Sequence, residues 1–287
     1  KGKGKDGKGK GKGKGNNDSN AKSKRNKRAK DGFYVKDDAP DKVGETWEES
    51  RLTTGLELLG DLAPKSVRWD YVMKDEERRS FAGFLSCPFT KNQCNIFYSK
   101  VKEGTDWKQP MGPHGPVPRK TAWMTRRGCT CTYRYGGLEV PAQEFPNWMQ
   151  ELLKACMPLC GLSDPKDWPD SCNLNLYDDG NMSVGWHSDD EKLFQGKFND
   201  IRIISLSFGQ KRQFQLRLCW PEDWEGLGER TIMLGSGDLL TMEGMTQKHF
   251  MHRVPKEERS EGPRINLTWR WVLKHDPKCP ANRVRRR

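Results

Sequence analysis

The stretch NLYDDGNMSVGWHSDDE, residues 175–191, reads as a strand, a tight Asp-Gly-Asn turn and a second strand. Side chains two residues apart on an extended strand point to the same face, so His187 and Asp189 can bind one ion together. A His-x-Asp pair also occurs on ordinary solvated turns. A metal site therefore needs further ligands elsewhere in the chain.

A second group of candidate residues lies downstream, at His252 and in the segment RINLTWRW, residues 264–271. Strict alternation over these eight residues predicts a strand. One face is polar and carries Arg264, Asn266, Thr268 and Arg270, whereas the other carries Ile265, Leu267, Trp269 and Trp271. The polar face is either the solvated side of an edge strand or a carboxylate clamp, because a guanidinium group presents paired donors to a planar anion.

Together the two groups predict a metal centre. His187, Asp189 and His252 would form a 2-His-1-carboxylate triad, which is the ligand set of non-haem Fe(II) oxygenases and leaves coordination positions open. An anion clamp beside such a triad indicates an oxygenase with a dicarboxylate co-substrate. His249 is the rival for the third ligand position, although it lies on the opposite strand face from His252.

The C-terminal half of the chain has the pattern of a β protein. Strands are expected at 172–178, 184–189, 201–208, 212–218, 231–234, 238–243, 248–254 and 263–273. Short strands at this spacing, joined by Gly and Asp turns, predict a sandwich or jelly-roll. Helices are expected over Thr90–Val101 and Pro141–Leu162, with a short one near Leu52–Leu62. The fold class is therefore mainly β (α+β).

The region before this core contains two unusual segments. Prolines and glycines over residues 109–118 predict irregular structure. The segment TCTYRYGG, residues 130–137, alternates and ends in Gly-Gly, as half of a β-ribbon would, with Tyr133 and Tyr135 on one face. Basic residues interleaved with aromatics, including Arg119 and Trp123, suit phosphate contact and base stacking. The alternative is a hairpin packed on the core with a wet basic side.

The positive charge is concentrated at the N-terminus. Residues 1–30 hold thirteen Lys or Arg and two acids, a net charge of +11 against +12 for the whole chain. This Gly/Lys-rich tail is expected to be disordered and to attract nucleic acid. The cluster Lys22–Lys30 favours nuclear import. Residues 31–66 look like a polar linker of unassigned role, and residues 276–287 like a basic C-terminal tail.

The nine cysteines indicate a reduced, intracellular protein, because their number is odd and no secretory signal is visible. Cys129-Thr-Cys131 and the Cys156/Cys160 pair lack a clean zinc-finger spacing, so no metal is expected there. His114 and His275 are expected to serve loops or solvent. No apolar run has membrane-spanning length, and a monomer is expected.

Five segments of the chain occur in the order typical of one family. They are Asn175-x-Tyr177, His187-x-Asp189-Asp190-Glu191, Ser205-x-Ser207-Phe208-Gly209, His252-Arg253-Val254-Pro255 and Arg264-x-Asn266-Leu267-Thr268-x-Arg270. They resemble motifs of the AlkB family, Fe(II)- and 2-oxoglutarate-dependent nucleic-acid dealkylases, over about residues 67–275. The phrases at 186–191 and 242–247 look most like the animal homologue that acts on alkylated single strands.

The resemblance implies a fold, with a double-stranded β-helix over about 171–273 and a nucleotide-recognition lid over about 107–140. It also implies ligands. His187, Asp189 and His252 would bind Fe(II). Arg264, helped by Tyr177, would bind the distal carboxylate of 2-oxoglutarate. The residues expected to orient the metal-proximal end of 2-oxoglutarate are Asn175, Asn266 and Arg270.

The same resemblance implies a substrate side. Tyr133 and Tyr135 would line the pocket for the base, and Arg119 would lie close to the nucleic acid. Asp190 and Glu191 would face the base edge, where a carboxylate favours a cationic methylated ring. The alternative for the two acids is a solvated turn.

The implied reaction is removal of N-methyl groups from bases of the N1-methyladenine and N3-methylcytosine type. It consumes 2-oxoglutarate and O2 and releases formaldehyde, succinate and CO2. One departure concerns Met111–Pro116, where the family's duplex-repairing member carries an apolar wedge and this chain has no large aromatic. Single strands are therefore favoured. The alternatives are an oxygenase acting on protein or lipid, and a non-catalytic nucleic-acid-binding module.

Overall fold

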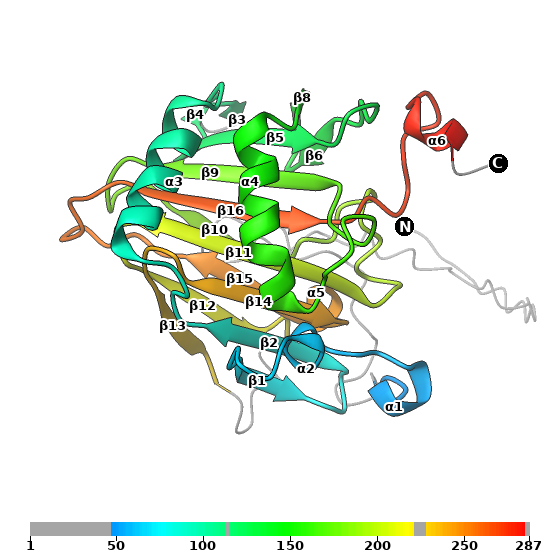
Figure 1. Ribbon diagram of the computed structural model, residues 1–287. Coiled ribbons are helices and arrows are strands. Elements are labelled where there is room, and N and C mark those ends of the chain that lie inside the picture. Colours follow the sequence, from blue (N-terminus) through cyan, green and yellow to red (C-terminus); the bar gives the residue numbers. More distant parts are fainter. Residues whose placement is uncertain (1–46, 113–114, 221–227, 285–287) are drawn as a thin grey trace, which may run out of the picture. The chain divides into compact units, whose positions relative to one another are not determined.

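The computed structural model describes residues 47–112, 115–220 and 228–284 (Figure 1). The basic tail and the Lys22–Lys30 cluster lie outside these residues. The larger sheet has eight strands: β1 (Asp70–Asp75), β2 (Ser80–Leu85), β5 (Lys120–Thr125), β8 (Ala142–Glu144), β9 (Ser171–Tyr177), β11 (Ile201–Gly209), β14 (Leu239–Gly244) and β16 (Arg264–Arg270). Their order is β1-β2-β14-β11-β16-β9-β5-β8.

A second sheet has four strands: β10 (Val184–His187), β12 (Arg212–Leu218), β13 (Arg230–Leu234) and β15 (Phe250–Val254). Their order is β10-β15-β12-β13, and every pair in this sheet is antiparallel. One hydrophobic cluster joins residues of both sheets, such as Ile203 and Met242 from the larger and Phe214 and Leu216 from the smaller. The predicted two-sheet, mainly β fold is confirmed.

Two small hairpins lie outside the two sheets. Tyr133–Tyr135 (β6) pairs with Leu138–Val140 (β7) across the turn at Gly136 and Gly137, both of which have positive φ. Such a turn favours glycine because L side chains clash there, and the predicted β-ribbon is confirmed. Met111–Gly112 (β3) pairs with Gly115–Pro116 (β4). The prediction of irregular structure at 109–118 was wrong at these four residues, where Gly112 pairs with Gly115, whose positive φ glycine adopts without strain.

Strand β16 explains the position of the site. It lies between β11 and β9 and is buried on both faces, so the edge-strand alternative is wrong. Its apolar residues Ile265, Leu267 and Trp269 pack with helices α3 (Lys91–Glu103) and α4 (Asn147–Cys156), which cross the larger sheet in Figure 1. Its polar residues therefore point to the other side, toward the smaller sheet.

The helices follow local signals. α3 begins after Thr90, whose side chain and that of Gln93 form a reciprocal capping box. The helix predicted over Pro141–Leu162 is shorter than expected: β8 precedes it, α4 starts only after Pro146, and a 3-10 turn (Met157–Cys160) follows. Pro158 explains this last change, because proline has no N–H to continue the helical hydrogen bonds.

The described part of the expected linker, residues 47–66, contains two short helices, α1 (Arg51–Thr54) and α2 (Leu59–Leu62). Gly55, in the left-handed region, ends α1. Leu58 and Leu59 are buried, and the backbone N–H of Leu59 donates to Oε2 of the buried Glu243 at 2.8 Å. This segment therefore packs against the larger sheet through Glu243 of β14.

Two expectations concern the whole described chain. All nine cysteines lie within it, and all are free thiols. Among the described helices, none combines the length and apolar character needed to cross a membrane.

Candidate active site

The three side chains predicted to bind metal lie close together beside β10 and β15 of the smaller sheet. β10 and β15 pair with His187 opposite His252, and opposed residues of an antiparallel pair lie close together. Asp189 follows β10, with its carboxylate oxygens 3.7 Å from His187 Nε2 and 3.8 Å from His252 Nε2. The ligand atoms of the three residues all lie within 4.8 Å of one another. This geometry fits one cation held from three sides.

Neighbouring groups orient these ligands. His187 Nδ1 lies 2.8 Å from the carbonyl oxygen of Gly185, and donating there leaves Nε2 as an acceptor for a cation. His252 stacks on Phe214, with ring centroids 5.4 Å apart. The backbone N–H of Asp189 donates to Gln247 Oε1 at 2.8 Å. The side-chain Oδ2 of Asp189 accepts from Arg270. Each ligand is thus fixed before any metal binds.

The protonation states also suit a cation. Burial would raise the pKa of Asp189, but the charges of Arg270 and the two histidines outweigh burial and lower it to about 2. Burial, together with the neighbouring His187, lowers the pKa of His252 to about 3. The pKa of His187 is lowered as well, chiefly by burial. At neutral pH the site therefore presents one carboxylate and two neutral imidazoles.

The triad is accessible from one side only. The His187 side chain is 30% exposed, whereas those of Asp189 and His252 are 3% and 6% exposed. Small molecules would therefore approach past His187.

Arg264 supplies an anion site deeper in the fold. Its side chain is buried, with Cζ 5.3 Å from the centre of the Tyr177 ring and Nη2 donating to Ser207 Oγ at 2.9 Å. Among the described residues, Nε and Nη1 find no hydrogen-bond partner. Buried donors without acceptors are costly, and a carboxylate would satisfy both at once. The chemistry of 2-oxoglutarate fits this position.

The other residues expected to orient 2-oxoglutarate make contacts within the protein. Asn266 Nδ2 donates to Ser205 Oγ at 2.7 Å, and its Oδ1 accepts from Thr268 at 3.0 Å. Asn175 Oδ1 accepts from Arg119 Nε at 2.8 Å. Arg270 meets Asp189 as well as the Tyr133 hydroxyl, 3.5 Å from its Nη1. Arg270 therefore links the triad to Tyr133 of β6.

The residues expected on the substrate side form a cluster beside the triad. Tyr133 Oη donates to Glu191 Oε1 at 2.6 Å, and the rings of Tyr133 and Tyr135 are 5.2 Å apart. The Arg119 guanidinium lies 5.7 Å from the Tyr135 ring centre. Tyr135 Oη and Glu191 Oε2 are buried without a partner among the described residues. Asp190 instead lies 3.6 Å from Lys197 Nζ.

Burial, with the nearby Asp189 charge, raises the pKa of Glu191 to about 7. Burial also raises the pKa of Tyr133 well above its usual value. The Tyr133 hydroxyl therefore keeps its proton, and Glu191 has a protonation state that a cationic partner would shift toward the carboxylate.

Sequence reasoning misplaced Trp123 and missed Gln247. Trp123, expected to stack on bases, is fully buried, with its ring stacked on Tyr133 at 5.0 Å. It supports the lid tyrosine from inside. Gln247, which holds the backbone of Asp189, carries no local pattern that would have revealed it. The rival ligand His249 turns away from the triad, with Nε2 2.8 Å from Glu48 Oε1.

Comparisons with known proteins agree with this site. The model of the 2OG-Fe(II) oxygenase superfamily matches residues 79–270. The alpha-ketoglutarate-dependent dioxygenase alkB homolog 3 of Mus musculus is 38% identical over 176 residues, which are 58% of this chain and 57% of that protein. The DNA oxidative demethylase ALKBH2 of Bos taurus is 30% identical over 207 residues, 66% of this chain and 69% of that protein.

A solved structure, that of OsALKBH1, is 17% identical and covers 71% of this chain and 99% of its own, with a TM-score of 0.48. The chain spans about three fifths of the length of the alkB homolog 3 proteins that it matches. The matched residues contain the His187, Asp189 and His252 cluster and the Arg264 site. The chain belongs to the 2OG-Fe(II) oxygenase superfamily, whose members use Fe(II), 2-oxoglutarate and O2, and within it to the AlkB family.

Proposed function

We propose that this protein is an oxidative demethylase that removes N-methyl groups from nucleic-acid bases, with a preference for single strands. The observation that carries the proposal is the pairing of two arrangements. A triad of Fe(II)-ligand type contacts Arg270, and the same polar face of β16 carries Arg264, two of whose donors have no partner among the described residues. Arg270 also contacts Tyr133, which with Tyr135 and Glu191 forms the expected substrate side. The name of the bovine relative, a DNA oxidative demethylase, supports the same substrate class.

In this proposal His187, Asp189 and His252 hold Fe(II), and Arg264 holds the distal carboxylate of 2-oxoglutarate. When bound, Fe(II) with 2-oxoglutarate and O2 supplies the oxidation of N–CH3 to N–CH2OH, with succinate and CO2 as the other products. The cationic N-hydroxymethyl base then loses formaldehyde and a proton, which leaves the ring nitrogen neutral and unmodified. Arg270 keeps Asp189 ionised and oriented throughout.

The lid side chains would position the base. Tyr135, which is only partly buried, offers a ring face on which a base can stack, and the buried Tyr133 packs beside it, with ring centroids 5.2 Å apart. Such stacking is worth about 1–3 kcal/mol per base. Glu191 Oε2 and Tyr135 Oη, buried without partners among the described residues, can meet the polar edge of that base. A positive charge on N1-methyladenine or N3-methylcytosine would favour the ionised form of Glu191. A base held in this way would bring its methyl carbon near the triad.

The proposed preference for single strands rests on the β3–β4 hairpin. The sequence there, Met111-Gly-Pro-His-Gly-Pro116, offers no aromatic wedge to fill the gap that a flipped base leaves in a duplex. Single strands need no such filling, because their bases are already accessible.

The basic tail, outside the described residues, is proposed to bind phosphate and to carry a nuclear import signal at Lys22–Lys30. Deleting residues 1–30 should weaken oligonucleotide binding and flatten its dependence on salt, since fewer counterions are released. Binding measured at several salt concentrations tests this, and an unchanged slope would refute the phosphate contact.

The decisive experiment measures turnover on matched substrates. The full chain, with Fe(II) and 2-oxoglutarate, is given single- and double-stranded DNA and RNA containing N1-methyladenine or N3-methylcytosine, and mass spectrometry follows the methylated base and succinate. We expect demethylation and formaldehyde release, fastest on single strands, and none with His187→Ala. Formaldehyde from a methylated peptide but not from any oligonucleotide would refute the substrate class.

A further inference from the structure

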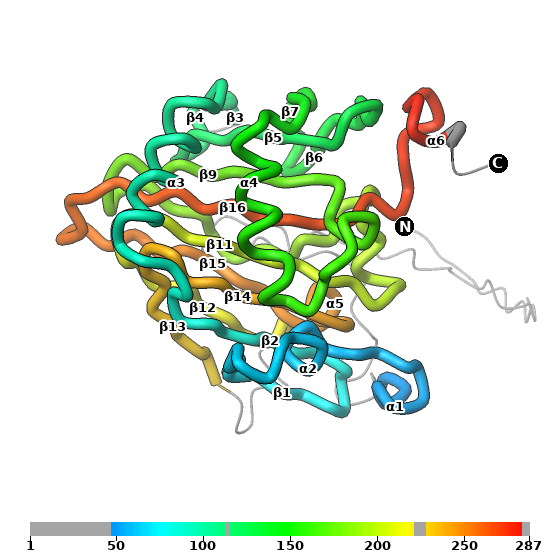
Figure 2. The backbone as a smooth tube through the Cα atoms, in the orientation of Figure 1, coloured from blue at the N-terminus to red at the C-terminus, as the bar shows by residue number. Residues whose placement is uncertain are grey.

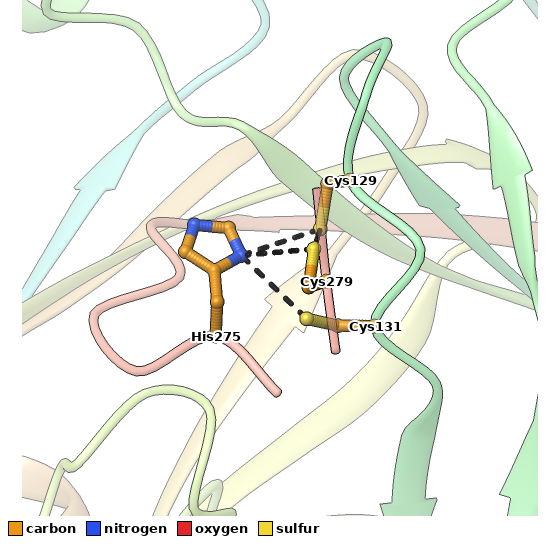
Figure 3. Close-up of side chains that lie close together, drawn as sticks. All are labelled: Cys129, Cys131, His275 and Cys279. Atoms are coloured by element: carbon orange, nitrogen blue, oxygen red, sulfur yellow. Dashed lines mark hydrogen bonds between the residues drawn. The ribbon is translucent and has the colours of Figure 1, made fainter. Parts of the chain in front are cut away.

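A second cluster of metal-ligand side chains lies at the root of the lid, apart from the triad. Cys129 and Cys131 precede β6, and His275 and Cys279 follow β16. Figure 3 shows His275 with Nδ1 directed at all three sulfur atoms. The spacing of Cys129 and Cys131 predicted no metal site, and His275 was expected to serve a loop or solvent. The fold brings together Cys129 and Cys279, which are 150 residues apart.

The distances within the cluster are those of a tetrahedron around one ion. His275 Nδ1 lies 3.5 Å from Cys129 Sγ, 3.5 Å from Cys131 Sγ and 3.7 Å from Cys279 Sγ. The sulfur atoms of Cys129 and Cys279 are 3.8 Å apart. Zinc held at about 2.3 Å from sulfur and about 2.0–2.1 Å from nitrogen gives tetrahedral edges of about 3.8 Å and 3.6 Å.

The surroundings are those of a closed, structural site. Cys131 and Cys279 are 1% and 2% exposed. Backbone N–H groups point at two of the sulfurs: that of Asp276 at Cys131 Sγ, 3.2 Å away, and that of Thr130 at Cys279 Sγ, 3.4 Å away. Such donors stabilise thiolates and fix their orientation. A disulfide is the alternative use of paired cysteines, but its sulfurs must approach to about 2.05 Å, and all four groups converge here instead.

We propose that Cys129, Cys131, His275 and Cys279 bind one structural Zn(II). Three thiolates and an imidazole form a Cys3His ligand set, which favours zinc over the harder cations. Four protein ligands complete a tetrahedron and leave no position for a substrate. This site therefore has a structural role, separate from the chemistry at His187, Asp189 and His252.

The position of the ion suggests what it stabilises. Cys131 is two residues from Tyr133, and its carbonyl oxygen accepts from Trp123 Nε1, the indole on which Tyr133 stacks. The carbonyl oxygen of Cys129 accepts from Thr125 Oγ1 at the end of β5. In Figure 2 the chain continues from β16 to α6 (Ala281–Val284), and His275 and Cys279 lie in the sequence between these two elements. Zinc would therefore tie the segment after β16 to the root of the lid.

The test uses the full chain with the triad removed, because zinc also binds histidine and carboxylate sites. A His187→Ala/Asp189→Ala double variant is purified with zinc, washed with a weak chelator and analysed by inductively coupled plasma mass spectrometry. We expect one zinc per chain. Adding Cys279→Ser, or Cys129→Ser, should reduce zinc to background, whereas the control Cys219→Ser, outside the cluster, should retain it.

Two further measurements keep the test decisive if a serine variant folds poorly. Co(II) bound to the double variant should give the intense visible bands of a tetrahedral site and the near-ultraviolet charge transfer of thiolate ligands. Stripping zinc should lower Tm by roughly 10 °C, because the metal binds only the folded chain. Background zinc in the double variant, zinc that survives both cluster variants, or a Cys129–Cys279 disulfide in the native protein would each overturn the proposal.

Discussion

The triad and the cysteine cluster are two metal-ligand sets in one fold, and they differ in openness. The triad offers three ligands, one of them on a side chain that is 30% exposed. The cluster offers four ligands, and backbone N–H groups meet two of its sulfurs. An incomplete coordination sphere leaves room for reactants, whereas a complete one holds chain segments together.

The two sets also differ in how the fold builds them. His187 and His252 face each other across neighbouring strands of a sheet, so ladder pairing alone places them. The cluster lies outside the strands, between the loop before β6 and the segment after β16. The triad is thus held by paired strands, whereas the proposed zinc would hold the loop before β6 to the segment after β16.

The largest effect is expected from Asp189→Asn. The amide is a weaker ligand for Fe(II), and it leaves Arg270 without its charged partner. Loss of groups that only orient a ligand already costs about 10–100-fold, so succinate formation should fall by more than ~100-fold. Zinc content should stay at one per chain. If iron and zinc were lost together, the two centres would not be independent.

Arg264→Ala tests the proposed binding of the 2-oxoglutarate carboxylate by Arg264. Truncating one partner of a buried, charged hydrogen-bonded pair costs about 2–5 kcal/mol, so the KM for 2-oxoglutarate should rise roughly 100-fold. Arg264→Lys is the matched variant, because it keeps the charge but not the two parallel donors, and its KM should lie in between. An unchanged KM in both variants would contradict the assignment.

Cys279→Ser should affect the two centres differently. The lid tyrosines would lose their support, so the KM for a methylated oligonucleotide should rise a few-fold, while iron content and the KM for 2-oxoglutarate stay near those of the native chain. Steady-state kinetics with each substrate varied in turn separates these constants. An equal rise in both KM values would indicate general loss of structure.

An effect as small as that of Cys279→Ser is expected from Tyr135→Phe. The change removes one hydroxyl and keeps the ring for stacking. One neutral hydrogen bond contributes about 0.5–1.5 kcal/mol, which corresponds to a fall of about 2–10-fold in kcat/KM on methylated oligonucleotides. Tyr135→Ala, which also removes the ring, should lose more. Equal activity of native protein and both variants would place the base elsewhere.

Much of the fold could be predicted from the sequence. The alternation at 264–271 assigned Ile265 and Arg264 to opposite faces, and the structure agrees. Pro146 and Pro158 explain why the helix predicted over Pro141–Leu162 is shorter in the structure, because proline is unfavourable in a helix interior. The sequence of β16 alone did not decide whether its polar face is buried or solvated, because burial depends on the neighbouring strands β11 and β9.

The remaining features depend on contacts between distant parts of the chain. Gln247 supports Asp189, and Trp123 supports Tyr133, without any spacing that marks either pair. The cysteine cluster consists of two halves, each unremarkable by itself, and only the folded chain shows that they meet. Spacing rules describe sites built within one short segment, so they fail for a site assembled from two.

The contacts made by residues 47–66 set a practical limit on how far this protein can be shortened. Glu48 contacts His249, and Leu59 donates to Glu243, whose side chain is fully buried in the larger sheet. A fragment starting at β1 would remove the Leu59 N–H that donates to Glu243. It would also expose the apolar surface that Leu58 covers. Protease digestion from the N-terminal end should therefore stop upstream of these leucines, and the surviving fragment would define the smallest autonomous enzyme.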